Sequence, residues 1–120
     1  MSPRELFERI EIASPPFCEV AKMHVADNSE LLPHLLMGDL LRYVGRHFEP
    51  DSGPAPRDKS EVVAVLAQLD NSLLCGSEET VNAIAVSFLE NIETEPFYSR
   101  LRPFLGLALR RELALQTRWR

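Results

Sequence analysis

The fold is decided by residues 60–93, which read SEVVAVLAQLDNSLLCGSEETVNAIAVSFLENIE. On both sides of Gly76, apolar side chains recur every three or four positions, the period of an amphipathic helix. The first stripe comprises Val62, Val65, Leu66, Leu69 and Leu73, and the second comprises Val81, Ile84, Ala85, Phe88 and Ile92. Ser77 and the two glutamates after it favour a new helix N-terminus directly beyond the turn. This segment therefore predicts two consecutive helices joined by a short turn.

The remaining sequence also predicts helices. Ser2, Pro3 and Glu5 form a helix start of the capping-box type, and residues 58–61 have the same pattern. A clear loop with three prolines and one glycine covers residues 49–57, and no segment alternates with the period of a strand. We expect an all-α, compact single-domain bundle of five to seven helices over residues 1–120, with helical hairpins stacked on one another as one arrangement. The expected helices are residues 3–13, 17–26, 33–48, 58–75, 77–93, 97–102 and 103–117.

Length and composition are those of an ordinary globular protein. The chain has 120 residues, of which 45% are hydrophobic and 26% charged, and its formal net charge is −5. A negative chain is a poor general binder of nucleic acid, because phosphate neutralisation requires a cationic surface. No apolar run approaches the roughly 18 residues of a membrane span, and the amphipathic start lacks the apolar centre of a signal peptide. We therefore expect a cytoplasmic protein.

The cysteines and histidines do not form the pattern of a metal or cofactor site. Cys18 and Cys75 are far apart and lie in apolar helical stretches, which predicts two reduced, buried thiols. None of the three histidines has a cysteine or an acid at metal-binding spacing on its helix turn. We expect no metal and no cofactor.

Charge is distributed unevenly along the second half of the chain. Residues 60–99 contain seven carboxylates and no lysine or arginine, whereas residues 100–120 contain six arginines and one acid, Glu112. Six of the carboxylates cluster near the ends of the two predicted helices: Asp70, Glu78, Glu79, Glu90, Glu93 and Glu95. An acidic surface of this kind speeds association with a basic partner. The alternative is that the arginines pair with these acids inside the fold and neutralise them.

Polar residues on the predicted helices have two interpretations each. Asp39 and Arg42 are three residues apart, so they form either an exposed ion pair or a polar patch for a partner. Glu90 and Asn91 close a helix, and they either bond nearby loop backbone or bind a partner. His34 lies in the first turn of its helix, where we expect a structural hydrogen bond. It lies five residues before Asp39 and therefore off its face, which weakens a catalytic His–Asp pair.

Small residues occur at three further positions within the predicted helices. Ser87 lacks the GxSxG context of a nucleophile, so we expect a packing residue bonded to a backbone carbonyl. Gly38 and Gly45 are seven residues apart and share a stripe, although glycine weakens a helix. The two glycines indicate either a close helix crossing or a backbone patch left open for a partner.

Two motifs give the chain a resemblance to known proteins. They are LPHLLMGDLLRYV at residues 32–44 and AVSFLEN at residues 85–91, and residues 105–113 add a closing LGLALRREL stretch. On these motifs the chain resembles an uncharacterised bacterial family of small helical proteins that is similar to immunity proteins, whose genes often lie near those of secreted toxins. The resemblance covers most of residues 31–113 and implies no enzymatic role. The residues that it carries over, without assigned roles, are Pro33, His34, Gly38, Asp39, Ser87, Glu90 and Asn91.

These observations predict an immunity protein that binds a bacterial toxin and is not an enzyme. Its acidic helical face would occlude a cationic active site or binding surface of the toxin. Tight binding would also need apolar or aromatic anchors, for which the candidates are Tyr43, Phe97, Tyr98 and Trp119. The predicted partner-binding residues are Asp39, Arg42, Tyr43, Asp70, Glu78, Glu79, Glu90, Asn91 and Glu93.

Two other classes of function stay open at this point. The first is a structural or regulatory module of a larger assembly, homodimeric through the stripe that contains Gly38 and Gly45. The second is a helical enzyme that uses His34 and Asp39. The enzyme requires those two side chains to converge in a pocket with a third polar group.

Overall fold

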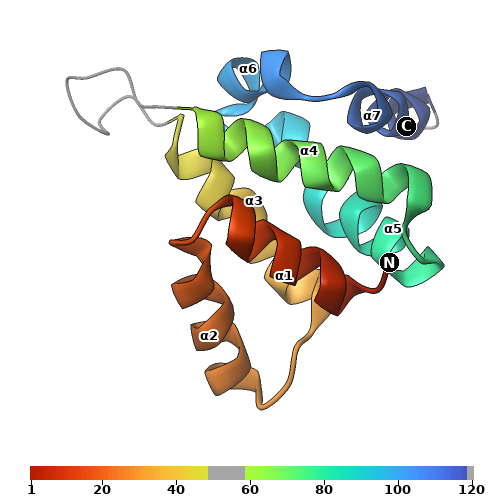
Figure 1. Ribbon diagram of the computed structural model, residues 1–120. Helices are drawn as coiled ribbons and strands as arrows, with labels where there is room; N and C mark the ends of the chain where they lie inside the picture. Colours follow the sequence, from red (N-terminus) through yellow and green to blue (C-terminus); the bar gives the residue numbers. More distant parts are fainter. Residues whose placement is uncertain (49–58, 119–120) are drawn as a thin grey trace.

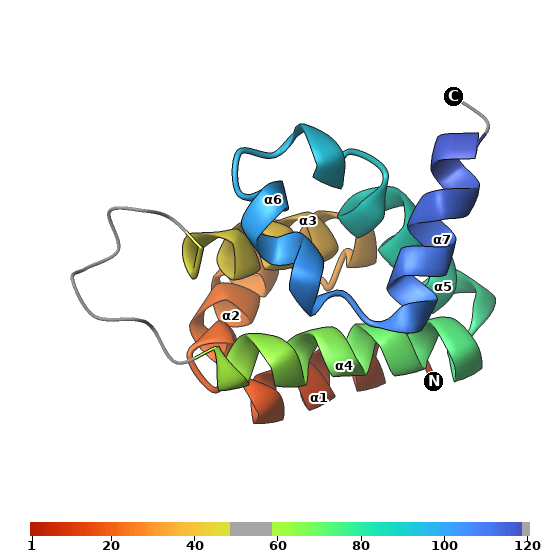
Figure 2. The same cartoon turned by 90° about the horizontal axis from the view of Figure 1, so that it is seen from above.

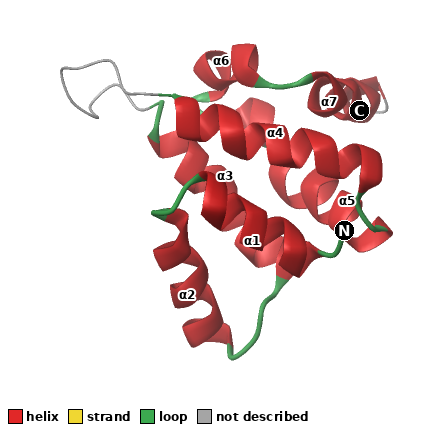
Figure 3. Cartoon of the chain, in the orientation of Figure 1, coloured by secondary structure: helices red, strands yellow, loops and turns green. Residues whose placement is uncertain are grey.

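The computed structural model describes residues 1–48 and 59–118, with side chains up to residue 116. Within these residues all regular structure is helical (Figure 3). The α-helices are α1 Pro3–Ala13, α2 Phe17–Asn28, α3 Pro33–Arg46, α4 Ser60–Cys75, α5 Glu78–Ala83, α6 Tyr98–Leu101 and α7 Leu107–Arg118. A π-helix, η1 Ile84–Leu89, and two 3₁₀ turns, η2 Ile92–Thr94 and η3 Arg102–Phe104, complete the described elements. The predicted all-α bundle is confirmed, while the predicted loop at 49–57 and the candidate anchor Trp119 lie outside the described residues.

The helices pack in layers around α4. Helix α1 lies along α4, and α7 packs against α4 on another side (Figures 1 and 2). Helix α3 makes its most extensive contact with η1, and α2 packs on α3 at the edge of the molecule. The apolar stripes meet in one core that contains completely buried residues from six elements: Leu6, Phe17, Leu40, Leu69, Phe88 and Leu109. None of the helices in the described ranges has both the length and the apolar character needed to cross a bilayer.

Helix starts agree with the capping prediction at two of three places. The Ser2 hydroxyl accepts a hydrogen bond from the backbone N–H of Glu5, and the Ser77 hydroxyl accepts one from that of Thr80. The third place differs, because α4 begins at Ser60 after a residue that makes no side-chain cap. Asp58 of that predicted capping box lies outside the described residues. Glu61 accepts a hydrogen bond from the Ser14 hydroxyl at 3.1 Å, so it joins α4 to the end of α1.

The continuous helix predicted over residues 77–93 is wrong in detail. Helix α5 ends at Ala83, and the chain continues as the wider π-helix η1, which packs on α3 and does not return along α4 as a hairpin would. The amide of Gln116 in α7 donates to the carbonyl oxygen of Ala85 at 2.8 Å. A side chain that bonds a helix carbonyl disturbs the regular hydrogen-bond ladder at that point. Because no glycine or proline marks the site, the sequence carries no signal for the π-helix.

Met1 is hydrogen-bonded to the turn between α4 and α5 and to the first turn of α5. The carbonyl oxygen of Met1 accepts two hydrogen bonds of 2.8 Å, one from the Ser77 backbone N–H and one from the Thr80 hydroxyl. The Ser72 hydroxyl lies 3.5 Å from the Met1 sulfur. The N-terminus therefore lies beside α5 (Figure 1).

The cysteines differ in part from the prediction. Both are free thiols, but Cys18 is only partly buried and Cys75 is exposed. Cys75 lies in the last turn of α4, where its thiol donates to the carbonyl oxygen of Asn71. The expectation of two buried thiols is therefore wrong, because Cys75 lies on the outer side of the α4 terminus.

Candidate functional site

Asp39 is the centre of a polar cluster between α2 and α3. Arg42 donates through Nη2 to Asp39 Oδ1, and the other carboxylate oxygen lies 3.8 Å from Nδ1 of His24. His24 is buried, with 4% of its surface exposed, and its Nε2 accepts a hydrogen bond of 2.9 Å from the Leu32 backbone N–H. Because Nε2 accepts, a neutral ring carries its hydrogen on Nδ1, which faces Asp39. The predicted pair of Asp39 and Arg42 therefore exists, and it is connected to the protein interior through His24.

His34 and Asp39 do not converge. His34 Nδ1 lies 2.8 Å from the Ser87 hydroxyl, which joins the start of α3 to η1. The structural hydrogen bond expected for His34 is present, whereas the expected bond from Ser87 to a backbone carbonyl is replaced by this side-chain contact. The enzyme hypothesis therefore lacks the pair of side chains that it required.

Two predicted partner-binding residues make contacts inside the fold. The Tyr43 hydroxyl lies 2.6 Å from the Ser14 hydroxyl, and Tyr43 is partly buried. Asp70 Oδ1 accepts a hydrogen bond of 2.9 Å from the backbone N–H of Leu109, in the first turn of α7. Gly106 precedes that turn, and a Cβ atom there would lie 2.6 Å from Asp70 Cγ. Asp70 thus takes the place of an N-cap side chain for α7, which begins at Leu107 and not at residue 103 as predicted.

The remaining predicted residues lie on the surface. The exposed set consists of Glu78, Glu79, Glu90, Asn91 and Glu93. Asp39 forms ion pairs with His24 and Arg42, whereas neither Glu78 nor Glu79 has a cationic partner among the described side chains. Arg100 donates to the carbonyl oxygen of Phe48 at 2.7 Å, and Arg110 donates to that of Pro103 at 3.3 Å. These two arginines therefore bond backbone oxygens and leave Glu78 and Glu79 unpaired within the described residues.

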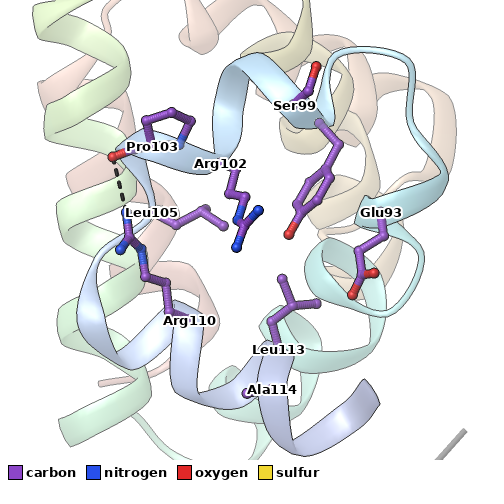
Figure 4. A pocket seen from close by; sticks show the side chains of 9 residues that line it. Glu93, Ser99, Arg102, Pro103, Leu105, Arg110, Leu113 and Ala114 are labelled. Carbon is purple, nitrogen blue, oxygen red and sulfur yellow. Dashed lines mark hydrogen bonds between the residues drawn. The ribbon is translucent and has the colours of Figure 1, made fainter. Parts of the chain in front are cut away.

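One cavity is lined both by an acid of residues 60–99, Glu93, and by two arginines of residues 100–120, Arg102 and Arg110. It has a volume of about 790 Å³ and is bordered by η2, α6, η3 and α7. Figure 4 shows the Arg102 side chain extending into the middle of the cavity, Arg110 turned toward Pro103, and Glu93 at the opposite rim. Arg102 and Glu93 share this space without an ion pair. Tyr98, one of the predicted anchors, also lines the cavity and is only partly exposed.

A smaller hollow lies between η1 and α7. It has a volume of about 310 Å³ and is lined by Ala85, Val86, Glu90 and Gln116. Val86 is 43% exposed, which makes it an apolar surface beside two polar side chains. The amide nitrogen of Gln116 is bonded to Ala85, and the amide oxygen Oε1 has no hydrogen-bond donor among the described residues. The hollow therefore combines an apolar wall with polar side chains.

A family model described as a domain of unknown function (DUF7674) matches residues 7–119. The chain belongs to this family. No curated protein and no solved structure matches the sequence. The DUF7674 match begins within α1 and includes every side chain of the polar cluster, the cavity and the hollow.

Two parts of these sites, His24 and the hollow beside Val86, were not found from the sequence. His24 had a signal, because it lies on the same face of α2 as the buried residues Phe17 and Ala21. Its contacts with Leu32 and Asp39 depend on the angle between α2 and α3, which no local pattern gives. The hollow beside Val86 was missed because it is formed by the π-helix η1, which the sequence does not signal.

Proposed function

We propose that this DUF7674 protein is an immunity protein that binds a bacterial toxin through the exposed face of α5 and η1. One observation carries the proposal: Glu78 and Glu79 are exposed and have no cationic partner among the described side chains. Carboxylates in this state attract a basic partner over several ångströms and raise the association rate. The toxin surface covered by this face is therefore expected to be cationic.

The hollow beside Val86 supplies the short-range contact that surface charge alone does not provide. Exposed ion pairs contribute little to affinity, so a tight complex needs a side chain buried at its centre. The aliphatic part of a lysine or arginine fits against Val86, in the hollow that the Glu90 and Gln116 side chains also line. Val86 and Gln116 replace Tyr43 and Asp70 in the proposed binding set, because Tyr43 and Asp70 make contacts inside the fold.

The test measures complex formation with the product of an adjacent toxin gene. In the charge-reversal variant, Glu78→Lys with Glu79→Lys, the association rate at low salt should fall by about tenfold or more, and this difference should shrink as salt rises. Val86→Ala should mainly speed dissociation, because it removes an apolar contact within the hollow. The matched control is Glu19→Lys with Glu30→Lys, two exposed acids in and just after α2, which lies at the other end of the molecule from α5 (Figures 1 and 2).

The control should bind with the kinetics of the unmodified protein. Equal slowing in both double variants would show an effect of net charge alone and would remove the assignment to α5. Unchanged association in the α5 variant would remove the role of the two glutamates. Failure of the two purified proteins to form any complex would reject the immunity function.

A further inference from the structure

A groove lined by three arginines lies between α3 and residues 95–100. It has a volume of about 430 Å³ and is lined by Arg42, Gly45, Arg46, Glu95, Pro96, Phe97 and Arg100. Arg42 and Arg46 are one helical turn apart on α3, and Arg100 comes from α6 on the opposite wall. The lining contains three guanidinium groups and one carboxylate, that of Glu95, and Asp39 pairs with Arg42 from outside the lining, so one positive charge remains in excess.

The glycines of α3 allow this groove to form. A Cβ atom on Gly45 would lie 2.6 Å from the Phe97 ring carbons Cδ1 and Cζ, so the ring rests directly on the helix backbone. At Gly38 a Cβ atom would lie 3.8 Å from Nη1 of Arg42, so the guanidinium lies over that glycine. The two predicted explanations of the glycine stripe, a helix crossing and an open patch, are therefore replaced. An aromatic ring covers Gly45, and an arginine side chain lies over Gly38.

Two of the three guanidinium groups are held in place by the fold. Arg42 is fixed by Asp39, whose other oxygen faces the buried His24, and Arg100 donates to the Phe48 carbonyl oxygen. A guanidinium has five N–H donors, so each still has donors for a ligand. Arg46 is exposed and has no ion-pair partner among the described residues. The groove thus presents donors that lose little conformational entropy when they bind an anion.

We propose that this groove binds an organic phosphate whose ester group is planar and apolar. A carboxylate is satisfied by one guanidinium in a bidentate pair, whereas a dianionic phosphate with three free oxygens accepts from several at once. The ring of Phe97 and the side chain of Pro96 form the apolar wall, against which a planar group stacks. Glu95 remains available to accept from a hydroxyl or N–H group of the ligand. This site lies on α3 and α6, and it does not use the α5–η1 face of the proposed immunity function.

The test is an NMR titration of the full chain with phenyl phosphate, inorganic phosphate and benzoate in parallel. We expect phenyl phosphate to shift the Gly45 amide and the Phe97 ring signals, and to bind about tenfold or more tightly than each of the other two probes. Arg46→Gln should weaken phenyl phosphate by about tenfold, because it removes a charge-assisted contact. Arg46 is exposed and has no ion-pair partner among the described residues, so this variant should keep its stability.

Arg9→Gln is the matched control, because Arg9 is an exposed arginine of α1. It should bind phenyl phosphate as the unmodified protein does. Equal weakening by Arg9→Gln would show unspecific charge screening and overturn the proposal. Benzoate binding as tightly as phenyl phosphate would assign a carboxylate ligand instead. An aspartate-rich peptide that displaces phenyl phosphate at lower concentration would assign the groove to a protein ligand, and absence of shifts at Gly45 would reject the site.

Discussion

Replacement of Gly45 by alanine tests the packing of Phe97 on α3. The new Cβ atom would lie 2.6 Å from two ring carbons, about 1 Å closer than a normal carbon contact. The ring must therefore move, and overpacking of this kind costs about 1–3 kcal/mol. Alanine also stabilises a helix by up to about 1 kcal/mol relative to glycine. We expect the free energy of unfolding to fall by about 1–2 kcal/mol and Tm to fall by several degrees.

Gly38→Ala is the internal control, because it makes the same chemical change in the same helix. Its nearest contact outside the helix backbone would be Arg42 Nη1 at an ordinary 3.8 Å. This variant should therefore gain stability, by up to about 1 kcal/mol. Urea unfolding followed by circular dichroism measures both variants, and they should differ by about 2 kcal/mol.

The clash between the new Cβ atom and the Phe97 ring is isolated by making the same substitution in a Phe97→Ala protein. In a Phe97→Ala protein the space over Gly45 is open, so Gly45→Ala should stabilise it by about as much as Gly38→Ala does. The reasoning would be refuted if Gly45→Ala stabilised the unmodified protein, or if it destabilised the Phe97→Ala protein to the same extent.

Three further substitutions test contacts that the sequence did not reveal. Asp70→Ala should lower the free energy of unfolding by about 1–2 kcal/mol through loss of the α7 cap, and Asp70→Asn by much less, since asparagine also accepts there; equal losses in urea unfolding would contradict the capping role. His24→Ala should cost about 2–3 kcal/mol, because it leaves the Leu32 N–H without an acceptor, and unchanged hydrogen exchange of that amide would oppose this. Ser14→Ala should cost about 1–2 kcal/mol in thermal unfolding and less in a Tyr43→Phe background, where only its bond to Glu61 is left to lose; an equal loss in both backgrounds would argue against the hydroxyl pair.

Local pattern predicted the helices and most of the buried face. Leu109 and Leu113 of α7 are buried one helical turn apart, as the helix period requires, while Leu105 is buried although it precedes α7. The same rule places Leu36, Leu40 and Val44 in the core. These positions need no knowledge of which helix lies opposite.

The local sequence pattern did not predict the polar contacts between helices. Asp70 was placed on an acidic surface because residues 60–99 contain seven carboxylates and no lysine or arginine, but the N-terminus of α7 lies against it and supplies a donor. No sequence spacing brings Arg46 and Arg100 together, since they come from separate elements that meet where Phe97 packs on Gly45 and Arg100 bonds the Phe48 carbonyl oxygen. Helix period fixes which side of a helix is buried, and packing angles fix which polar groups meet.

The attachment of Met1 to the turn before α5 has a consequence for synthesis on the ribosome. The carbonyl oxygen of Met1 and the hydroxyl of Thr80 are separated by 79 positions, and α1 packs chiefly on α4. A nascent chain that has released only its first half leaves the apolar side of α1 uncovered. Helix α1 therefore gains its main packing partner only after α4 has been synthesised, and the hydrogen bond from Thr80 forms later still.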